Sequence, residues 1–294
     1  MRKVRKAIVP IAGLGTRFLP FSKTLSKELF PLADLPMLQY LLKELKDSKI
    51  KEVIFVNRPE KAGILDYFKP DGKLKEILRK RGKKDLLKEV ADLERITEGM
   101  VLRQVFQKEP LGAAHAVLQA KKYVKNEPCA VLWADDLVAS KVPCTKQLMD
   151  AFENYQRPIT ALYRVPKESF KYYGMADAKK IGNRIFKINK FVEKPKTAEK
   201  APSNLAVVGK YIITPDVFDI LGKIKFDLKS DLSMTEILSY MAENGKDVYG
   251  CEFEGKWLEC GNKLAYLKTN IYFILNHPKY GKEIRKYIKQ EKLC

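Results

Sequence analysis

The sequence predicts an α/β protein with a Rossmann-like mixed central sheet, a small antiparallel subregion and C-terminal helices. Three observations support this prediction. Short apolar runs of strand character alternate with amphipathic helical stretches. A glycine-rich loop directly follows the first run, and a pair of aspartates follows a later one. The 294 residues are 46% apolar and 31% charged, which is typical of a folded chain and not of a disordered one.

The first half of the chain shows the alternation most clearly. Residues 6–11 predict a buried strand that ends in a glycine loop. Pro36 predicts the start of a helix, because proline fits the first turn and apolar residues then recur at helical spacing. Further strands are expected over 52–56, 101–107 and 130–134, and helices over about 60–96 and 112–124.

The second half has a looser pattern that contains one hairpin signal. Gly182-Asn183 separates two strand-like runs, 178–181 and 185–188, as in a β-hairpin. Around it the sequence predicts a helix ending at Tyr155, strands over 159–165, 205–213 and 248–253, two helices between the last two strands, and two C-terminal helices from about Lys263. Because no repeat or flexible linker divides the chain, we expect one domain over 1–294.

Composition argues against several classes of protein. No apolar stretch approaches the roughly 18 residues of a membrane span. The first residues read as a strand and its loop, since glycines interrupt the apolar run that a secretory signal needs. Five cysteines without a CxxC pair and only two histidines argue against a disulfide framework or a zinc site. A reduced, cytoplasmic chain without a membrane partner is therefore expected.

The net charge of +20 raises the question of nucleic acid. The densest basic stretch is 73–88, where leucines and isoleucines recur at roughly helical spacing and no aromatic residue is available to stack on bases. We interpret it as the solvated face of a helix and expect no nucleic-acid partner. A basic surface would still attract anionic small substrates.

A glycine loop with two cations is the first motif that carries chemistry. Residues 13–17 (Gly-Leu-Gly-Thr-Arg) follow the first strand, but position 18 is Phe where a dinucleotide fingerprint has a third glycine, and no Walker A ending is present. The loop still offers backbone N–H groups to phosphate oxygens, and Arg17 and Lys27 would suit a triphosphate. Taken alone, the loop is equally typical of an ordinary turn.

Two further motifs contain carboxylates. Asp135 and Asp136 follow a buried strand, where α/β sheets bind ligands and where hard oxygen ligands could hold Mg²⁺ against phosphates. Glu193 and Lys194 end another strand, where a carboxylate could accept sugar hydroxyls and a lysine could pair with a phosphate. Turn aspartates and solvated charges at a strand end explain these motifs as well, if each is taken alone.

The ordered set of motifs resembles the sugar-nucleotide pyrophosphorylases along almost the whole chain. The matching stretches are 6–10, 12–20, 27–31, 107–112, 115–117, 132–137, 191–195, 202–209 and 260–264. The last two resemble the uridylyltransferase branch more than the thymidylyl branch. The resemblance implies the nucleotide-diphospho-sugar transferase fold, with a nucleotide-binding half over 1–144, a sugar-phosphate-binding half over 145–262 and C-terminal helices over 263–294 that could contact another subunit.

The resemblance also implies an activity and a set of site residues. It implies transfer of UMP from UTP to glucose 1-phosphate by Mg²⁺-assisted in-line attack at the α-phosphorus, in an enzyme that is a homo-oligomer. The implied catalytic residues are Arg17, Lys27, Asp135 and Lys194. The implied nucleotide-binding residues are Ala12, Gly13, Gly15, Thr16, Arg17, Lys27, Gln107, Gly112 and Asp135. Gly174, Glu193 and Lys194 would bind the sugar phosphate, and Asp135 and Glu259 the Mg²⁺.

Within this set, Gln107 and Gly112 would read uracil, since a glutamine amide can both donate to and accept from the imide edge of that base. His115 is expected to make a structural hydrogen bond and Cys260 to pack, without contacting ligand.

Departures from the family pattern leave two alternatives open. The family usually has Arg where Phe106 stands, Gly where Ala114 stands and Asp where Glu259 stands, and Asp231 replaces a Glu. A non-catalytic regulatory homologue of the same fold is one alternative. An enzyme of the same fold that acts with dTTP or another sugar phosphate is the other.

Overall fold

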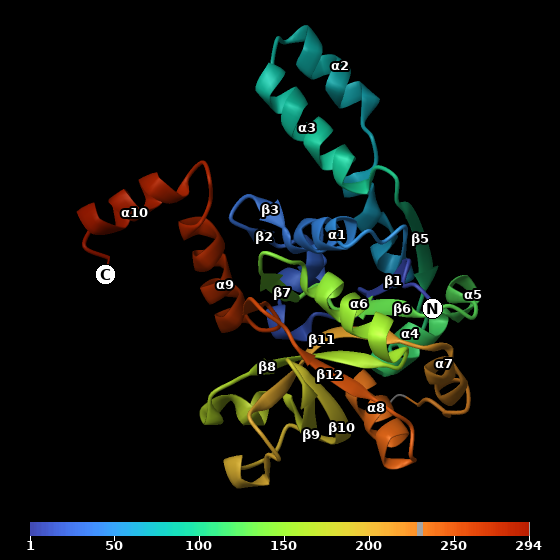
Figure 1. Ribbon diagram of the computed structural model, residues 1–294. Helices are drawn as coiled ribbons and strands as arrows, with labels where there is room; N and C mark the ends of the chain where they lie inside the picture. Colours follow the sequence, from blue (N-terminus) through green and yellow to red (C-terminus); the bar gives the residue numbers. More distant parts are fainter. Residues whose placement is uncertain (228–231, 294) are drawn as a thin grey trace.

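A nine-stranded mixed sheet runs through the molecule (Figure 1). The computed structural model describes residues 1–227 and 232–293, so Asp231 and Cys294 lie outside the described residues. The strands, in their order across the sheet, are β5 (Val101–Phe106), β4 (Glu52–Asn57), β1 (Lys6–Pro10), β6 (Cys129–Leu132), β11 (Leu205–Ile213), β8 (Ile159–Arg164), β12 (Tyr249–Glu252), β10 (Ile185–Glu193) and β9 (Gly174–Gly182).

Strand direction divides this sheet into two regions. The strands β5, β4, β1 and β6 are parallel to one another, whereas β11 runs antiparallel to both β6 and β8. The predicted hairpin is longer than its sequence signal, since β9 and β10 have nine residues each. Ala206 of β11 also pairs with Met175 of β9, so the antiparallel end of the sheet folds back on itself. The antiparallel subregion is thus continuous with the main sheet.

The parallel strands are buried on both faces, which explains their uninterrupted apolar runs. In β1, Ala7 and Val9 belong to one core and Ile8 belongs to the other, because successive side chains point to opposite faces. One core is completed by α1 (Met37–Asp47) and α6 (Cys144–Tyr155). The other is completed by α4 (Gly112–Gln119), α7 (Pro215–Leu221) and α8 (Met234–Glu243).

Two predicted helical stretches each contain more than one helical element. The helical insert predicted over about 60–96 is present, and it consists of a 3-10 segment, η4 (Pro59–Phe68), followed by a hairpin of α2 (Gly72–Lys80) and α3 (Lys84–Thr97). Gly82 makes the turn between the two helices with a φ of 64°, a conformation that glycine adopts without strain. The stretch 112–124 divides into α4 and α5 (Lys121–Val124).

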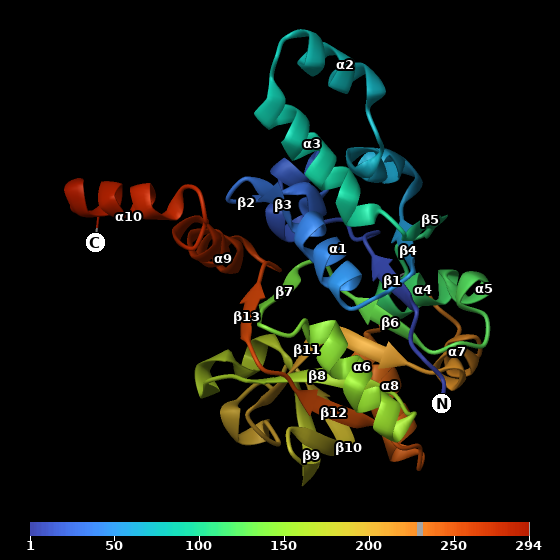
Figure 2. The same ribbon diagram turned by 45° about the horizontal axis from the view of Figure 1, so that its top comes forward.

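Four short strands were not predicted, and they form two ribbons of two strands each. The strand β7 (Asp136–Ala139) pairs with β13 (Lys256–Glu259), as Figure 2 shows, and β2 (Pro31–Leu32) pairs with β3 (Leu35–Pro36). Asp136 therefore begins a new strand and does not merely end the preceding one. The remaining 3-10 segments are η1 (Thr16–Phe18), η2 (Phe21–Lys23), η3 (Lys27–Leu29), η5 (Lys167–Tyr172) and η6 (Ala198–Lys200).

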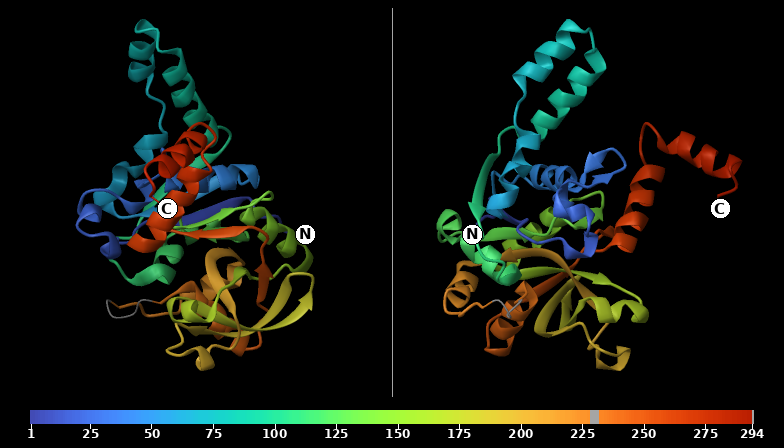
Figure 3. Two further views of the ribbon diagram at one scale, coloured as in Figure 1. Left: turned by 90° about the vertical axis from the view of Figure 1, so that its left-hand side faces the viewer. Right: turned by 180° about the vertical axis from the view of Figure 1, so that it is seen from behind.

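Two helical arms extend from the body of the molecule (Figure 3). One is the α2–α3 hairpin, which contains the basic stretch 73–88. The other is formed by α9 (Lys263–Leu275) and α10 (Gly281–Gln290). Within the described residues, no helix has the length and apolar character that crossing a membrane requires.

Candidate active site

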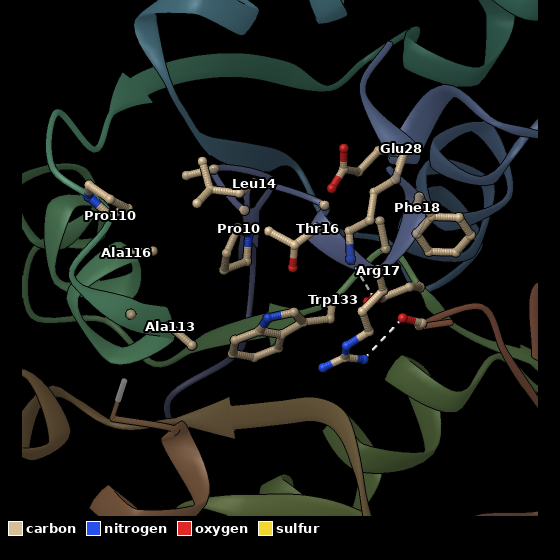
Figure 4. A pocket seen from close by; sticks show the side chains of 18 of the residues that line it. Pro10, Leu14, Thr16, Arg17, Phe18, Glu28, Pro110, Ala113, Ala116 and Trp133 are labelled. Carbon is tan, nitrogen blue, oxygen red and sulfur yellow. Dashed lines mark hydrogen bonds and ion pairs between the residues drawn. The ribbon is translucent and has the colours of Figure 1, made fainter. Parts of the chain in front are cut away.

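A cavity of about 510 Å³ opens at the carboxyl ends of the parallel strands. After β1 the chain continues to β4, which lies on one side of β1 in the sheet, whereas β6 lies on the other side. The strand order therefore reverses at β1, and the loops after β1 and β6 flank this point. Ligands bind at this place in open α/β sheets. In Figure 4, Pro110, Ala113 and Ala116 lie along one side of the cavity, and Arg17, Phe18 and Glu28 along the other.

The glycine loop after β1 lines this cavity with its backbone. Gly15 has a φ of 67° and precedes η1, and its carbonyl oxygen accepts a hydrogen bond of 2.7 Å from the Ser22 hydroxyl. A Cβ at Gly15 would lie 3.1 Å from the Ser22 Cβ, so both the conformation and the close approach favour glycine. Among the described residues, apart from its two chain neighbours, no atom lies within 4 Å of the position that a Cβ would take at Gly13, which leaves that backbone open to a ligand.

Lys27 and Asp135 form a buried ion pair in the cavity wall, with 2.5 Å between Nζ and Oδ2. Burial by itself raises the pKa of Asp135, but the Lys27 ammonium outweighs it and holds that pKa below its usual value. Burial likewise lowers the pKa of Lys27, and the carboxylates of Asp135 and Glu28 outweigh it, so this pKa is raised. Both side chains are therefore charged at neutral pH.

Three charged side chains meet around the α-carbon of Gly261. A Cβ there would lie 3.1 Å from Glu259 Oε1, 3.3 Å from Arg17 Nη1 and 3.6 Å from Asp135 Oδ2. The Arg17 Nη1 group also donates a hydrogen bond of 3.0 Å to the Gly261 carbonyl oxygen (Figure 4). Glycine at 261 thus leaves open the space that these groups surround.

The two adjacent aspartates have different surroundings. Asp135 lines the cavity, whereas both oxygens of Asp136 are bound within the framework: Trp257 Nε1 donates to Oδ1 at 2.8 Å, and the Gly209 amide donates to Oδ2 at 3.1 Å. Burial and the nearby charge of Asp135 raise the pKa of Asp136 to about 7. A side chain at Gly209 would overlap Asp136 Oδ2, so glycine there permits the contact that positions β7.

Gln107 follows β5 and lies almost fully buried in the wall of the cavity. Its Nε2 donates a hydrogen bond of 3.0 Å to the carbonyl oxygen of Gly112, a residue with a φ of 89°. The surrounding wall is apolar, formed by Pro110, Ala113 and Ala116. A flat ring with polar edges fits such a pocket.

All nine residues predicted to bind the nucleotide line this one cavity, whereas the three predicted to bind the sugar phosphate do not. Gly174 and Glu193 are paired across β9 and β10, and a Cβ at Gly174 would lie 2.8 Å from Glu193 Oε2. Lys194 follows with its Nζ 3.3 Å from Glu193 Oε1, and its side chain is 58% exposed.

Tyr173 connects these residues to Glu259, a predicted metal ligand that does not itself line the cavity. Its carbonyl oxygen accepts a hydrogen bond of 3.1 Å from the Lys194 amide, and its hydroxyl donates one of 2.7 Å to Glu259 Oε2. Burial and Glu259 raise the pKa of Tyr173, so the hydroxyl stays protonated as a donor. Glu259 is therefore held between Tyr173 and the space beside Gly261.

Several residues of the site were not predicted from the sequence. Glu28, next to Lys27, is only 2% exposed and lines the cavity, and among the described residues its Oε2 has no hydrogen-bond partner. Burial raises the pKa of Glu28. The signal in the sequence that could have identified Glu28 was its charge next to Lys27, a lysine predicted to bind ligand. Gly261 stands in the matching stretch 260–264, which was the available signal for it. Tyr173 lies next to predicted residues in space, and no matching stretch contains it.

Comparison with known proteins identifies the family. The family model for nucleotidyl transferases matches residues 6–274. A UTP–glucose-1-phosphate uridylyltransferase of Staphylococcus epidermidis is 38% identical over 291 residues, 99% of each chain. A solved UTP-bound UGPase from Acinetobacter baumannii has a TM-score of 0.88 and 32% identity, over 97% of this chain and 98% of that one. A UDP-glucose pyrophosphorylase complexed with UDP-glucose has a TM-score of 0.81 and 33% identity, over 92% and 98%. This chain therefore belongs to the nucleotidyl transferase family.

Proposed function

We propose that this chain transfers UMP from UTP to glucose 1-phosphate, giving UDP-glucose and pyrophosphate. The observation that carries the proposal is the convergence of all nine predicted nucleotide-binding residues on one cavity. The bridge from Lys194 through Tyr173 to Glu259 supports a sugar-phosphate site beside it. The full-length uridylyltransferase relative, and the solved relatives named as bound to UTP or UDP-glucose, support the choice of substrates.

The reaction needs charge neutralisation more than acid–base chemistry. The second pKa of a phosphate monoester is roughly 6, so a glucose 1-phosphate oxygen is already anionic at neutral pH. This oxygen forms a bond to the α-phosphorus of UTP. The bond between that phosphorus and the oxygen that bridges it to the β-phosphorus breaks, and pyrophosphate leaves with the electron pair. Arg17, Lys27 and Lys194 would bind the two polyanions and align them for in-line attack.

The donor set around Gly261 fits Mg²⁺. Asp135 Oδ2 and Glu259 Oε1 are hard oxygen ligands that face the same open space, and we propose that they hold the ion. Mg²⁺ usually combines one or two protein carboxylates with substrate phosphates, and Asp135 and Glu259 would supply the carboxylates. When bound, the ion would offset the charge of the phosphates.

Pyrophosphate release from purified protein tests the proposed function. We expect rapid release with glucose 1-phosphate, Mg²⁺ and UTP, and little with CTP, ATP or GTP. Rapid release with dTTP and not with UTP would contradict the proposal and favour an enzyme of the same fold that uses dTTP. Bound UTP without release from any nucleotide would contradict the proposal and favour the regulatory homologue. Omitting Mg²⁺ is expected to abolish release.

We also propose that the chain forms homo-oligomers through the α9–α10 arm. Leu264, Leu267 and Ile271 recur on α9 at helical spacing and are 63%, 55% and 54% exposed. Exposed apolar stripes of this kind mark interaction surfaces. Sedimentation velocity is expected to show a species larger than one chain, and a monomer at micromolar concentration would contradict the proposal.

The four cysteines within the described ranges are free and buried, which supports a cytoplasmic location.

A further inference from the structure

We propose that His115 is a positioning residue that sets base selectivity by fixing the orientation of the Gln107 side-chain amide. The inference rests on the proposed function, since it assumes that Gln107 faces the base of the nucleotide. His115 does not line the cavity. It lies behind Gln107, on the first turns of α4, and would act on the nucleotide only through that glutamine.

The contacts of the Gln107 amide nitrogen carry the inference. Nε2 lies 3.0 Å from the Gly112 carbonyl oxygen and 2.9 Å from His115 Nδ1. The carbonyl oxygen can only accept, so the NH₂ group and not Oε1 must face it. One hydrogen of the NH₂ group is used there and the other points to His115. Oε1 is then the polar atom that the amide has left for a ligand.

The second contact requires one form of the histidine ring. Since Nε2 of Gln107 is a donor, His115 Nδ1 must be an unprotonated acceptor, and the ring hydrogen must lie on its own Nε2. That ring nitrogen lies 2.9 Å from Gln119 Nε2, which also lies 3.3 Å from the His115 carbonyl oxygen. Because an NH₂ group cannot accept the ring hydrogen, this tautomer requires the Gln119 amide to turn by 180° and place its oxygen against the ring. Burial lowers the pKa of His115 although Glu109 opposes it, so the neutral ring is favoured. The ring of Phe226, 5.1 Å away between centroids, packs against the imidazole.

Base selectivity follows from the chemistry of the two pyrimidines. Uracil and thymine carry a hydrogen on N3, which an amide oxygen can accept. Cytosine has an unprotonated N3, and its lone pair would face the same oxygen without a hydrogen between them. An amide held with Oε1 toward the base therefore accepts UTP or dTTP and rejects CTP. An amide that is free to rotate by 180° would offer its NH₂ group to cytosine N3 and lose this discrimination.

Two near-isosteric variants separate this role from packing. In His115→Asn the side-chain oxygen can occupy the place of Nδ1 and keep an acceptor there, whereas His115→Leu has a similar shape and no acceptor. We expect His115→Leu to lower the ratio of kcat/KM for UTP over CTP by about tenfold or more, the usual effect of one unpaired buried polar group. The UTP over dTTP ratio should not change, and His115→Asn should keep both ratios near those of the wild type. Equal UTP over CTP ratios in the Leu and Asn variants would overturn the inference.

Nitrogen-15 NMR of the imidazole rings gives a second test that needs no variant. The chain has only two histidines, so the spectrum of the wild-type protein labelled at histidine is simple. We expect an unprotonated Nδ1 and a protonated Nε2 for His115 at pH 7. The opposite tautomer, or a doubly protonated ring, would overturn the inference.

Failure of the proposed function would be recognised separately. If the wild-type protein releases no pyrophosphate with any nucleotide, the proposed function fails. Calorimetric titration of UTP and CTP into the wild type and both variants would then measure the selectivity of binding by itself. A UTP preference that is lost in His115→Leu and kept in His115→Asn would support the role of His115 even in that case. A preference equal in both variants would contradict it.

Discussion

Replacing Asp135 with asparagine is expected to lower the rate of pyrophosphate release by about a hundredfold to a thousandfold at saturating substrates. Asparagine keeps the shape of the side chain but removes the negative charge that pairs with Lys27 at 2.5 Å and faces the space beside Gly261. In the proposed function this carboxylate also helps to hold Mg²⁺. A higher Mg²⁺ requirement of the remaining activity should therefore accompany the loss in rate.

An exposed aspartate provides the control for Asp135. Asp150 on α6 has a side chain that is 51% exposed and pairs with Lys146, one helical turn earlier, and such surface pairs contribute little. Asp150→Asn should leave the rate and the Mg²⁺ requirement unchanged. If Asp135→Asn retained more than a third of the wild-type rate, the assignment of Asp135 to the catalytic centre would be wrong.

Replacing Lys194 with methionine is expected to lower kcat/KM for glucose 1-phosphate by about a hundredfold, with little effect on KM for UTP. The lysine is more than half exposed and lies 3.3 Å from Glu193, so its ammonium is free to reach an incoming phosphate. Methionine keeps most of the length of the side chain without its charge. Lys190→Met, on the exposed part of β10, the strand that Lys194 follows, is the matched control and should behave as the wild type. A loss confined to UTP binding would contradict the assignment.

Gly174→Ala tests the same site by shape instead of charge. The new methyl group would lie 2.8 Å from Glu193 Oε2 and 3.2 Å from Thr235 Cγ2, so Glu193 must move. We expect KM for glucose 1-phosphate to rise by about tenfold, since small displacements of positioning groups are costly. Gly182→Ala lies on the same strand with its nearest neighbour at 3.8 Å and should be neutral. Equal effects of the two substitutions would show that the loss is not specific to the site.

The predicted helices and strands that agree with the structure are those whose apolar residues recur with a strong local period. The helix α1 has its leucines 38, 41, 42 and 45 on one buried face, and Pro36 stands at its N-cap. The strand β11 is buried almost without interruption, and it was predicted over the residues that the structure shows. The strands β7 and β13 were missed because four residues without alternation carry no periodic signal, and their pairing joins segments about 120 residues apart.

The site residues likewise divide into those that stand in sequence motifs and those that only the fold reveals. The glycine loop, Lys27, Gln107 and Asp135 stand in motifs whose residue types suggest phosphate, base and metal chemistry, and they line one cavity. Glu28 did not stand out, because a glutamate beside a lysine is ordinary until burial removes its solvent.

The sequence by itself determined the α/β class, the family and the short list of residues with suitable chemistry, because those depend on local period and on motifs in a fixed order. Only the tertiary structure decided that Asp135 faces the cavity while Asp136 binds Trp257 and Gly209. It also decided that Tyr173 reaches Glu259. These contacts form between segments that sheet pairing brings together, and a hydrogen bond depends on distances and angles that residue order does not specify.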